Sequence, residues 1–177
     1  MIHLSKIADL SDDERAAIRT LSQAVYPADT VKDWPGRHIE WSQPEWCVRI
    51  HGDRGVLASY VGVVIREGTL DGQPVKVGGI GGVMTHPAER ARGLAGKGIR
   101  RAVDSFRKQG DIAFGLLVCE ERLLRYYGKL GWRGFLGQMK VRQRGADSDF
   151  TFNHVMTLGV AVEAPIAGTI DLCGPPW

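Results

Sequence analysis

Hydrophobic residues recur along the N-terminal part of the chain with the period of an amphipathic helix. Ile18, Leu21 and Val25 repeat at helical spacing. They follow Ser11-Asp12-Asp13-Glu14, a capping box in which the serine hydroxyl and the glutamate carboxylate satisfy free backbone N–H groups. The pattern predicts that the first element of the chain is a helix, and that this helix ends at Pro27.

The middle of the chain changes from loop markers to runs that are typical of strands. Residues 28–45 predict a loop with one short helix, because Trp34, Pro35, Trp41 and Pro44 interrupt the apolar pattern. Strands are predicted over 46–51, 57–66 and 75–85. The turns between them are Gly52-Asp53-Arg54-Gly55 and a hairpin at Asp71-Gly72. The third strand carries an unusual set of glycines: Gly78, Gly79, Gly81 and Gly82.

The second half predicts two more helices around a buried strand. Apolar residues share one face of the helix that follows Pro87, and basic residues share the other. The apolar face holds Ala95, Ile99, Ala102, Val103 and Phe106. Residues 112–119 form a nearly continuous apolar run, which indicates a central strand. Leu123, Tyr127 and Leu130 then predict a helix that stops at Gly131, and two further strands follow from Phe135. This order predicts an α/β fold, a mixed sheet with helices on its faces.

Composition limits the classes of protein that the chain can be. It has 177 residues, 44% of them hydrophobic and 24% charged, so we expect one globular domain over residues 1–177. No run of residues approaches the ~20 apolar residues of a membrane helix. Polar residues near the N-terminus argue against a signal peptide, and we expect a cytoplasmic protein. Cys47, Cys119 and Cys173 form neither a metal-ligand spacing nor a disulfide framework.

Basic residues cluster in one stretch although the net charge is only +3, which by itself does not indicate nucleic acid. A solvated helix face explains such a cluster, and so does an anion site. The segment Val83 to Gly96 favours the anion site, because small residues there open a helix whose free N–H groups bind anions. Arg90, Arg92 and Lys97 add positive charge. The segment is neither a P-loop nor a G-x-G-x-x-G dinucleotide motif.

Two motifs in this region resemble those of one enzyme family. Arg90, Gly93 and Ala95 form R-x-x-G-x-A, and Tyr127-Gly128-Lys129-Leu130-Gly131-Trp132 follows after one strand. Both are similar to the motifs of the GNAT superfamily of acetyl-CoA-dependent N-acetyltransferases. The resemblance implies a GNAT fold whose central strands splay around 82–85 and 112–119, acetyl-CoA as co-substrate, and no metal. It implies that cofactor contacts come from Val83, Met84, Thr85, Arg90, Ala91, Arg92, Gly93, Leu94, Ala95 and Gly96.

The same resemblance implies roles in acetyl transfer. The backbone N–H of Met84 would polarise the thioester carbonyl, and Tyr127 would protonate the leaving thiolate. Tyr126 is the adjacent competitor, but only Tyr127 is in the register of the motif. A plain core role for Tyr127 is the alternative.

The two ends of the chain resemble a narrower group, the aminoglycoside 2′-N-acetyltransferases, in which the chain ends in tryptophan near the antibiotic. Gly81 stands where those enzymes have a strand glutamate, and Val118-Cys119-Glu120 also departs from them. A branch of this group that acetylates kasugamycin is one with which the sequence is compatible. Acceptor contacts are then implied for Asp29, Asp33, Trp34, Gly81, Gly82, Glu120 and Trp177. A tail that only docks on the domain is the alternative.

The sequence offers several candidates for the general base and for the acceptor substrate. Candidates for the general base are Glu120, Glu121, His86, His154, Asp33 and the terminal carboxylate of Trp177. The favoured partner is a small-molecule amine, an aminoglycoside or aminosugar, with neither nucleic acid nor membrane. Alternatives are acetylation of a protein N-terminus, lysine or polyamine, and a non-catalytic acyl-CoA-binding module. A homodimer is compatible with the sequence.

Overall fold

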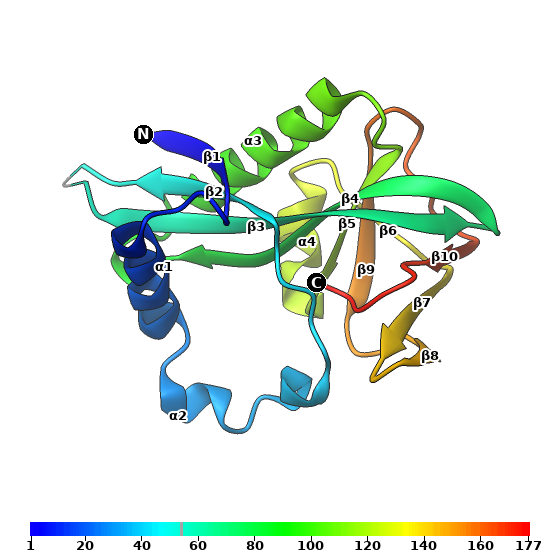
Figure 1. Ribbon diagram of the computed structural model, residues 1–177, viewed down its shortest axis with the longest axis horizontal. Coiled ribbons are helices and arrows are strands. Elements are labelled where there is room, and N and C mark those ends of the chain that lie inside the picture. The colour runs from blue at the N-terminus through cyan, green and yellow to red at the C-terminus, as the bar shows by residue number, and fades with distance from the viewer. Residues whose placement is uncertain (54) are drawn as a thin grey trace.

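The computed structural model describes residues 1–53 and 55–177, and Arg54 of the predicted turn lies outside them. Helices pack on a strongly twisted sheet (Figure 1). None of the helices in the described ranges is long and apolar enough to cross a membrane. The helices are α1 (Asp12–Val25), α2 (Ala28–Val31), α3 (Leu94–Gln109) and α4 (Leu124–Gly128), with 3₁₀ turns η1 (Pro35–His38), η2 (Pro87–Glu89) and η3 (Glu121–Leu123).

Within the described residues, ten strands form the sheet. Their main order is β6-β9-β5-β4-β3-β10-β7-β8, while β2 also pairs with β3 and β1 with β2. All neighbours are antiparallel except β4 with β5 and β10 with β7. The strands are β1 (Ile2–Lys6), β2 (Trp46–His51), β3 (Leu57–Leu70), β4 (Gln73–Thr85), β5 (Phe114–Cys119), β6 (Arg133–Gly134), β7 (Gln138–Gln143), β8 (Ala146–Asp149), β9 (His154–Gly159) and β10 (Thr169–Asp171).

The mixed α/β fold that the pattern predicts is confirmed, with corrections at the ends of the chain. The first element is strand β1, not a helix, because the short segment Ile2–Lys6 completes its hydrogen bonds only by pairing with β2. The region after Phe135 contributes four strands, β7 to β10, rather than two, and β6 precedes it. The last predicted helix is shorter: η3 and α4 end at Gly128, before Gly131.

The capping box of α1 forms as predicted and also joins the helix to the sheet. The Ser11 hydroxyl accepts from the Glu14 N–H, and the Glu14 carboxylate accepts from the Ser11 N–H. The same carboxylate binds the buried guanidinium of Arg49 on β2, with 2.5 Å between Nη1 and Oε1. This hydrogen bond from Arg49 lowers the pKa of Glu14. Since a buried cation requires a partner, the pair fixes where α1 lies on the sheet.

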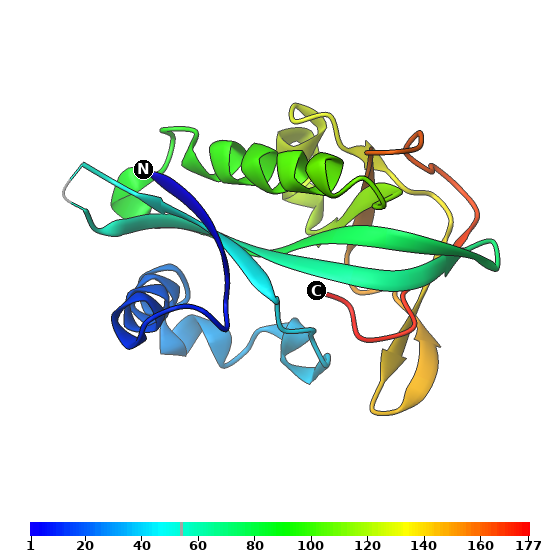
Figure 2. The same cartoon turned by 45° about the horizontal axis from the view of Figure 1, so that its top comes forward.

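Different elements cover the two faces of the sheet, and glycines of β4 allow them to pack closely on each face. Figure 2 shows α3 on one face, and α1, α2 and the C-terminal tail on the other. A side chain at Gly78 would meet the Phe106 ring of α3 at 2.7 Å, and one at Gly79 would meet the Trp177 indole on the opposite face. The glycines of the third predicted strand thus permit close packing on both sides.

The sheet opens between β4 and β5. The two strands pair through four residues each, from Val77–Phe114 to Ile80–Leu117. β4 continues to Thr85 and β5 to Cys119 without further pairing between them in the described chain. On its other edge β4 bulges: Gly82 has φ +56°, and two residues of β4 face only Val61 of β3. The predicted splay is therefore present, and it leaves one edge of β4 free.

Candidate active site

The turn before α3 has the backbone shape of an anion cradle. Ala91 and Gly93 both adopt left-handed φ values, +61° and +71°. Alternation of left-handed with ordinary residues turns successive N–H groups toward one concave side, where they bind anions. Gly93 is the N-cap of α3, so the positive end of the helix dipole adds to this site. A phosphate group fits these donors, and the left-handed conformation of Ala91, which is uncommon outside glycine, marks a functional turn.

Only one of the two predicted arginines has a free guanidinium in the described chain. The Arg92 side chain binds the carboxylate of Glu89 and, at 3.3 Å, that of Asp53 in the turn between β2 and β3. These ion pairs join the turn before α3 to the turn between β2 and β3, and the predicted role of Arg92 in cofactor binding stays a prediction. Arg90 is exposed and forms no ion pair with the described residues.

The free edge of β4 carries the residues predicted to meet the pantetheine chain: Val83, Met84 and Thr85. On the side of β3, the Ser59 hydroxyl donates to the Met84 carbonyl at 2.8 Å and lies 3.0 Å from the Thr85 hydroxyl oxygen. These contacts fix the strand where it leaves the ladder. The edge that faces β5 remains available for a ligand, because β5 has no paired residue there in the described chain.

Tyr127 of α4 lies in a core cluster that also contains Ile80 of β4 and Cys119 of β5. Its side chain is only 6% exposed, and its ring meets that of Tyr126 edge-on at 5.2 Å. Burial raises the pKa of Tyr127, and Cys119, Tyr126 and Tyr26 add to the shift. The hydroxyl is therefore protonated throughout the physiological range. Tyr127 can donate a hydrogen bond to a sulfur atom, but it is a weaker acid than an exposed tyrosine.

Two further tyrosines near this site were missed by the sequence analysis. Tyr60 of β3 pairs with Met84 and is buried, and burial raises its pKa as well. Tyr26 follows α1 and adds, as the smallest cause, to the raised pKa of Tyr127. Neither residue belongs to a recognisable motif, because strand register and helix packing alone put them there.

Trp177 lies against the sheet on the face opposite α3. It is 6% exposed, and its indole N–H donates to the Leu116 carbonyl of β5 at 3.1 Å. The ring covers Gly79, and its backbone carbonyl carbon lies 3.0 Å from where a Cβ of Gly81 would be. A glutamate at position 81 would collide with this tail. The close approach of the tail therefore favours a residue without a side chain at position 81.

Arg66 of β3 holds the tail in this position. Its guanidinium lies 5.7 Å from the Trp177 ring centroid, and its Nη2 donates to the Ser42 hydroxyl at 2.8 Å. Ser42 in turn donates its N–H to Pro176 and its hydroxyl to Pro175. The tail is therefore fixed to both β3 and the loop of residues 32–45, which gives a defined surface next to the splay.

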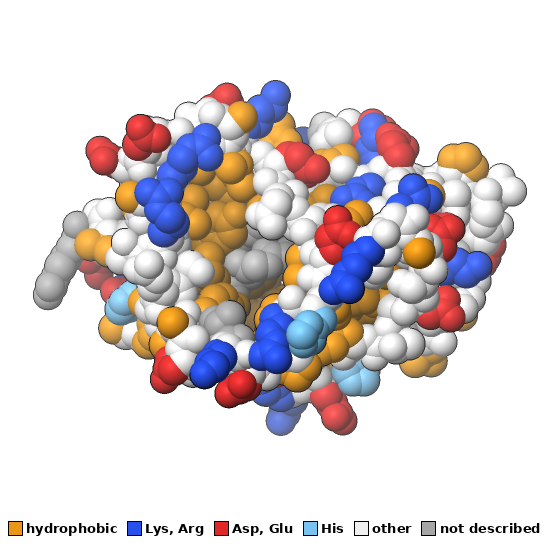
Figure 3. Space-filling view, turned by 60° about the horizontal axis from the view of Figure 1, so that its bottom comes forward, with side chains coloured by type: hydrophobic (Ala, Val, Ile, Leu, Met, Phe, Trp, Pro, Cys, Tyr) orange, Lys and Arg blue, Asp and Glu red, His pale blue; other side chains and the backbone are white. Residues whose placement is uncertain are grey.

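That loop carries a compact aromatic cluster. Trp34 and Trp41 stack with ring centroids 5.9 Å apart, and Phe152 meets both rings edge-on. The Trp41 N–H donates to the Gly36 carbonyl, which closes the turn between the two indoles. Trp34 stays 39% exposed. On this side of the molecule, Figure 3 shows a hollow with a largely hydrophobic floor and charged residues at its rim.

The candidates for a general base are not gathered at one point. Asp33 and Glu121 are exposed, as is Asp29, which was predicted as an acceptor contact, and Glu120 binds Arg122 at 2.6 Å. Gly82, which was predicted as an acceptor contact, is exposed at the bulge of β4. His86 Nδ1 accepts from the Ala88 N–H, so it caps η2, and His154 is exposed at the start of β9. None of the candidate side-chain carboxylates or imidazoles is buried in the described chain. The last candidate, the terminal carboxylate of Trp177, belongs to a buried residue, and its carbon lies 3.0 Å from where a Cβ of Gly81 would be.

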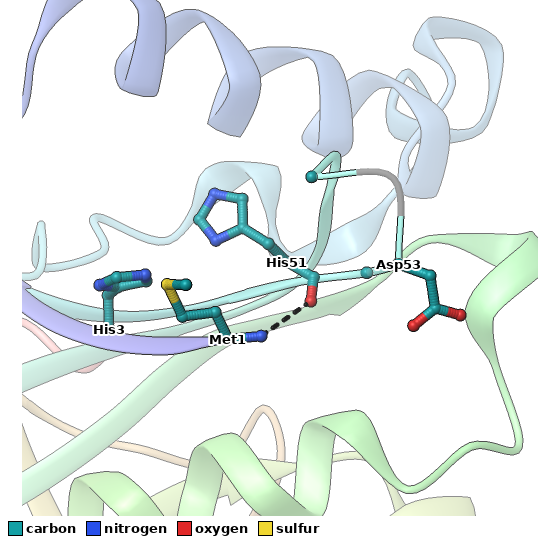
Figure 4. A pocket seen from close by; sticks show the side chains of 6 residues that line it. Met1, His3, His51 and Asp53 are labelled. Carbon is teal, nitrogen blue, oxygen red and sulfur yellow. Dashed lines mark hydrogen bonds between the residues drawn. The ribbon is translucent and has the colours of Figure 1, made fainter.

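A second hollow, of about 530 Å³, lies where the N-terminus meets the end of β2 (Figure 4). His3 and His51 meet there edge-on at 5.6 Å, and the N-terminal ammonium group donates to the His51 carbonyl. Asp53 borders it and links it to Arg92. Across residues 1–53 and 55–177, no group of three or more His, Cys, Asp and Glu is arranged to hold a metal.

Comparisons with known proteins agree with this geometry. The sequence profile described as an acetyltransferase (GNAT) domain matches residues 6–135. A GNAT family N-acetyltransferase (YhbS) from Escherichia coli, solved with CoA, has a TM-score of 0.63 and 16% identity over 97% of this chain and 88% of its own. A GNAT family acetyltransferase from Brucella melitensis, solved with acetyl-CoA, has a TM-score of 0.60 and 16% identity, over 96% and 94%.

The ribosomal-protein-S18-alanine N-acetyltransferase from E. coli is also similar in fold, with a TM-score of 0.57 and 15% identity over 92% of this chain and 96% of its own. A search of curated protein sequences finds no significant match. The structural likenesses support the fold, while the profile covers well over half of the chain and carries the assignment. Because that profile spans the anion cradle and the splayed strands together, the chain belongs to the GNAT family of acetyl-CoA-dependent N-acetyltransferases.

Proposed function

We propose that this enzyme acetylates a primary amine of an aminosugar, such as an aminoglycoside antibiotic, and that modification of the antibiotic gives resistance. Kasugamycin, a small atypical aminoglycoside, is the first compound to test. The observation that carries the proposal is the fixed tail: Trp177 covers Gly79 and Gly81 next to the splay, where an acceptor amine would approach.

Each of the two sequence motifs has a proposed role in binding or activating acetyl-CoA. The N–H groups of the cradle, from Ala91 to Gly96, hold the pyrophosphate of acetyl-CoA, and the free edge of Val83–Thr85 pairs with the pantetheine chain. Acetyl-CoA supplies the acetyl thioester. When acetyl-CoA is bound, a backbone N–H on the edge of Val83–Thr85 that faces β5 would contact the thioester carbonyl, and the Tyr127 hydroxyl would donate to the sulfur. Met84, predicted for the first role, pairs with Tyr60, and its carbonyl lies on the β3 side.

On the surface proposed to bind the acceptor, an aromatic ring face is more prominent than charged side chains. The exposed face of Trp34 suits a sugar ring, whose C–H groups pack on aromatic surfaces. Asp29 and Asp33 are exposed on the same stretch of chain and suit ammonium groups. Glu120 is already paired with Arg122, which makes it the weakest member of the predicted acceptor set.

No dedicated base is required if the amine arrives neutral. Solvent water then carries the proton away, and Asp33 and Glu121 are exposed carboxylates that such water can reach. A buried general base would instead make kcat fall as the pH drops below the pKa of that base. The exposure of the candidate side-chain carboxylates in the described chain favours the water route.

A panel assay tests the proposal. Release of the CoA thiol is measured with acetyl-CoA and kasugamycin, other aminoglycosides, spermidine, a lysine peptide and a peptide with N-terminal alanine. We expect the highest kcat/KM with an aminosugar. Faster turnover of either peptide or of spermidine overturns the substrate class. CoA binding without turnover of any amine would indicate a binding module instead.

Trp177→Leu tests the acceptor surface. We expect KM for the best amine of the panel to rise about tenfold, which corresponds to ~1.4 kcal/mol, because the ring face over Gly79 is lost. Stability should also fall, by less than the ~3–5 kcal/mol typical of Trp→Ala in a core. The CoA dissociation constant, measured by calorimetry, should not change.

Phe106→Leu is the matched control for this substitution, since Phe106 covers Gly78 on the opposite face as Trp177 covers Gly79. It should lower the melting temperature to a similar extent and leave the amine KM unchanged. Equal effects of the two substitutions on KM would mean that Trp177 is only a core residue.

A further inference from the structure

The turn that forms the anion cradle has little support from its own backbone. It connects η2 to α3 through residues 90–93, and two of these, Ala91 and Gly93, are left-handed. Left-handed backbone costs free energy at a residue with a side chain, so Ala91 needs support from the surrounding structure. Within the described residues, the N–H groups of residues 91–93 donate to no backbone carbonyl. These donors are free for an anion, but they do not hold the turn in shape.

Arg92, which lies between the two left-handed residues, supplies this support through its side chain. Two carboxylates bind its guanidinium: that of Glu89 in η2, and that of Asp53 in the turn between β2 and β3. The second contact measures 3.3 Å between Nη2 of Arg92 and Oδ2 of Asp53. A guanidinium is planar and presents its donors in a fixed fork, so carboxylates on two different elements restrict its position. The residue in the middle of the cradle is thereby connected to both of its neighbours.

The two carboxylates are themselves placed by backbone contacts. The N–H of His86, which directly precedes η2, donates to the Ala58 carbonyl of β3 at 2.9 Å. A Cβ at Gly52 would lie 3.6 Å from Oε1 of Glu89, so the Glu89 carboxylate lies against the turn that carries Asp53. The two acids and the Arg92 guanidinium therefore form one group, which we call the carboxylate clamp.

We propose that Asp53 and Glu89 are positioning residues for acetyl-CoA: by holding the Arg92 side chain they keep the N–H groups of the cradle turned toward the pyrophosphate. The inference rests on the proposed role of the cradle in binding acetyl-CoA. The carboxylates act through Arg92 and do not contact the cofactor. A turn that has its binding shape before the ligand arrives avoids the cost of ordering it on binding, so the clamp contributes to affinity.

The opposite role for Arg92 is that it leaves the carboxylates and binds a phosphate when CoA arrives. The two roles differ in the sign of one effect. Removal of either carboxylate would release Arg92 and would also remove a negative charge that repels the phosphates, so the opposite role predicts tighter CoA binding. The positioning role predicts weaker binding in spite of the lost repulsion. The left-handed conformation of Ala91, which needs support, favours positioning.

Calorimetric titrations of CoA with Asp53→Asn and Glu89→Gln test this sign. We expect each substitution to raise Kd about threefold, within the range of exposed ion pairs, with the melting temperature near the wild-type value. Asp53→Glu keeps the carboxylate and should restore most of the affinity. Asp104→Asn is the matched control, because Asp104 pairs with Arg107 at i,i+3 as Glu89 does with Arg92. It should leave Kd unchanged.

A double substitution shows whether Asp53 acts through Arg92. Once Arg92→Gln has removed the guanidinium, Asp53→Asn should weaken CoA binding little further. A full additional loss in the double variant overturns the positioning role, and so does unchanged or tighter binding in both single variants.

Failure of the cradle itself gives a different result. Gly93→Val would then bind CoA as the wild type does, and the basis of the inference would be lost with it. If Gly93→Val loses CoA while Asp53→Asn and Glu89→Gln keep the wild-type Kd, the cradle stands and the carboxylate clamp alone is rejected.

Discussion

Tyr127→Phe should lower kcat about 10²–10⁴-fold while the CoA dissociation constant stays near the wild-type value. The hydroxyl is the group in the core beside the splayed strands that can donate to a departing sulfur, and the Phe ring keeps the packing of α4. Because burial raises the pKa of Tyr127, its hydroxyl stays protonated above the pH at which an exposed tyrosine ionises. We therefore expect no alkaline fall in kcat from this group up to pH ~10.

Tyr126→Phe is the control for this experiment, since it removes a hydroxyl from the adjacent ring, which Tyr127 meets at 5.2 Å. Single-turnover rates should be compared, so that slow product release does not hide a loss in the chemical step. A Tyr127→Phe enzyme with the wild-type single-turnover rate would remove Tyr127 from the mechanism and leave it a core residue.

Gly93→Val should weaken CoA binding by two orders of magnitude or more. At φ +71° a β-branched residue is strained, and relief of that strain would turn the N–H groups of the cradle away from the phosphates. Loss of two charge-assisted hydrogen bonds is worth roughly 3 kcal/mol or more, which corresponds to at least ~100-fold in Kd. Calorimetric titration of CoA measures the change directly.

Gly110→Val provides a control with the same kind of backbone strain. Gly110 ends α3 at φ +82°, and like Gly93 it has no atom within 4 Å of a Cβ position. Both substitutions should lower the melting temperature by a similar amount, but only Gly93→Val should impair CoA binding. If the two proteins bind CoA equally well, the cradle does not hold the pyrophosphate.

The shape of the turn before α3 was predictable because the features that determine it are local. An anion cradle needs a short turn, glycine at left-handed positions and the start of a helix, and these are consecutive in Arg90 to Gly96. The same holds for the capping box of α1. Arg92 is the exception within this segment, because its partners include Asp53, which comes from a different turn of the chain.

The acceptor side was decided by tertiary contacts. The sequence pattern singled out Trp34, Gly81 and Trp177 separately, but it contained no sign of Arg66 or Ser42, which fix the tail and the loop together. The contacts of Ser42 with Pro175 and of Arg66 with Trp177 join residues more than a hundred positions apart, and no local periodicity records them. The edge strand β1 and the strands after Phe135 escaped prediction for a related reason, since short strands are stabilised by their neighbours in the sheet.

The sequence by itself determined the α/β class, the anion cradle and the GNAT motifs, because helix caps, turn glycines and apolar periodicity act over a few residues. Only the tertiary structure decided that Trp177 lies buried over Gly79 and Gly81, and that the Arg92 charge is taken up by Glu89 and Asp53. The physical reason is that burial and ion pairing depend on which distant segments meet, and the register and splay of β4 and β5 determine that meeting.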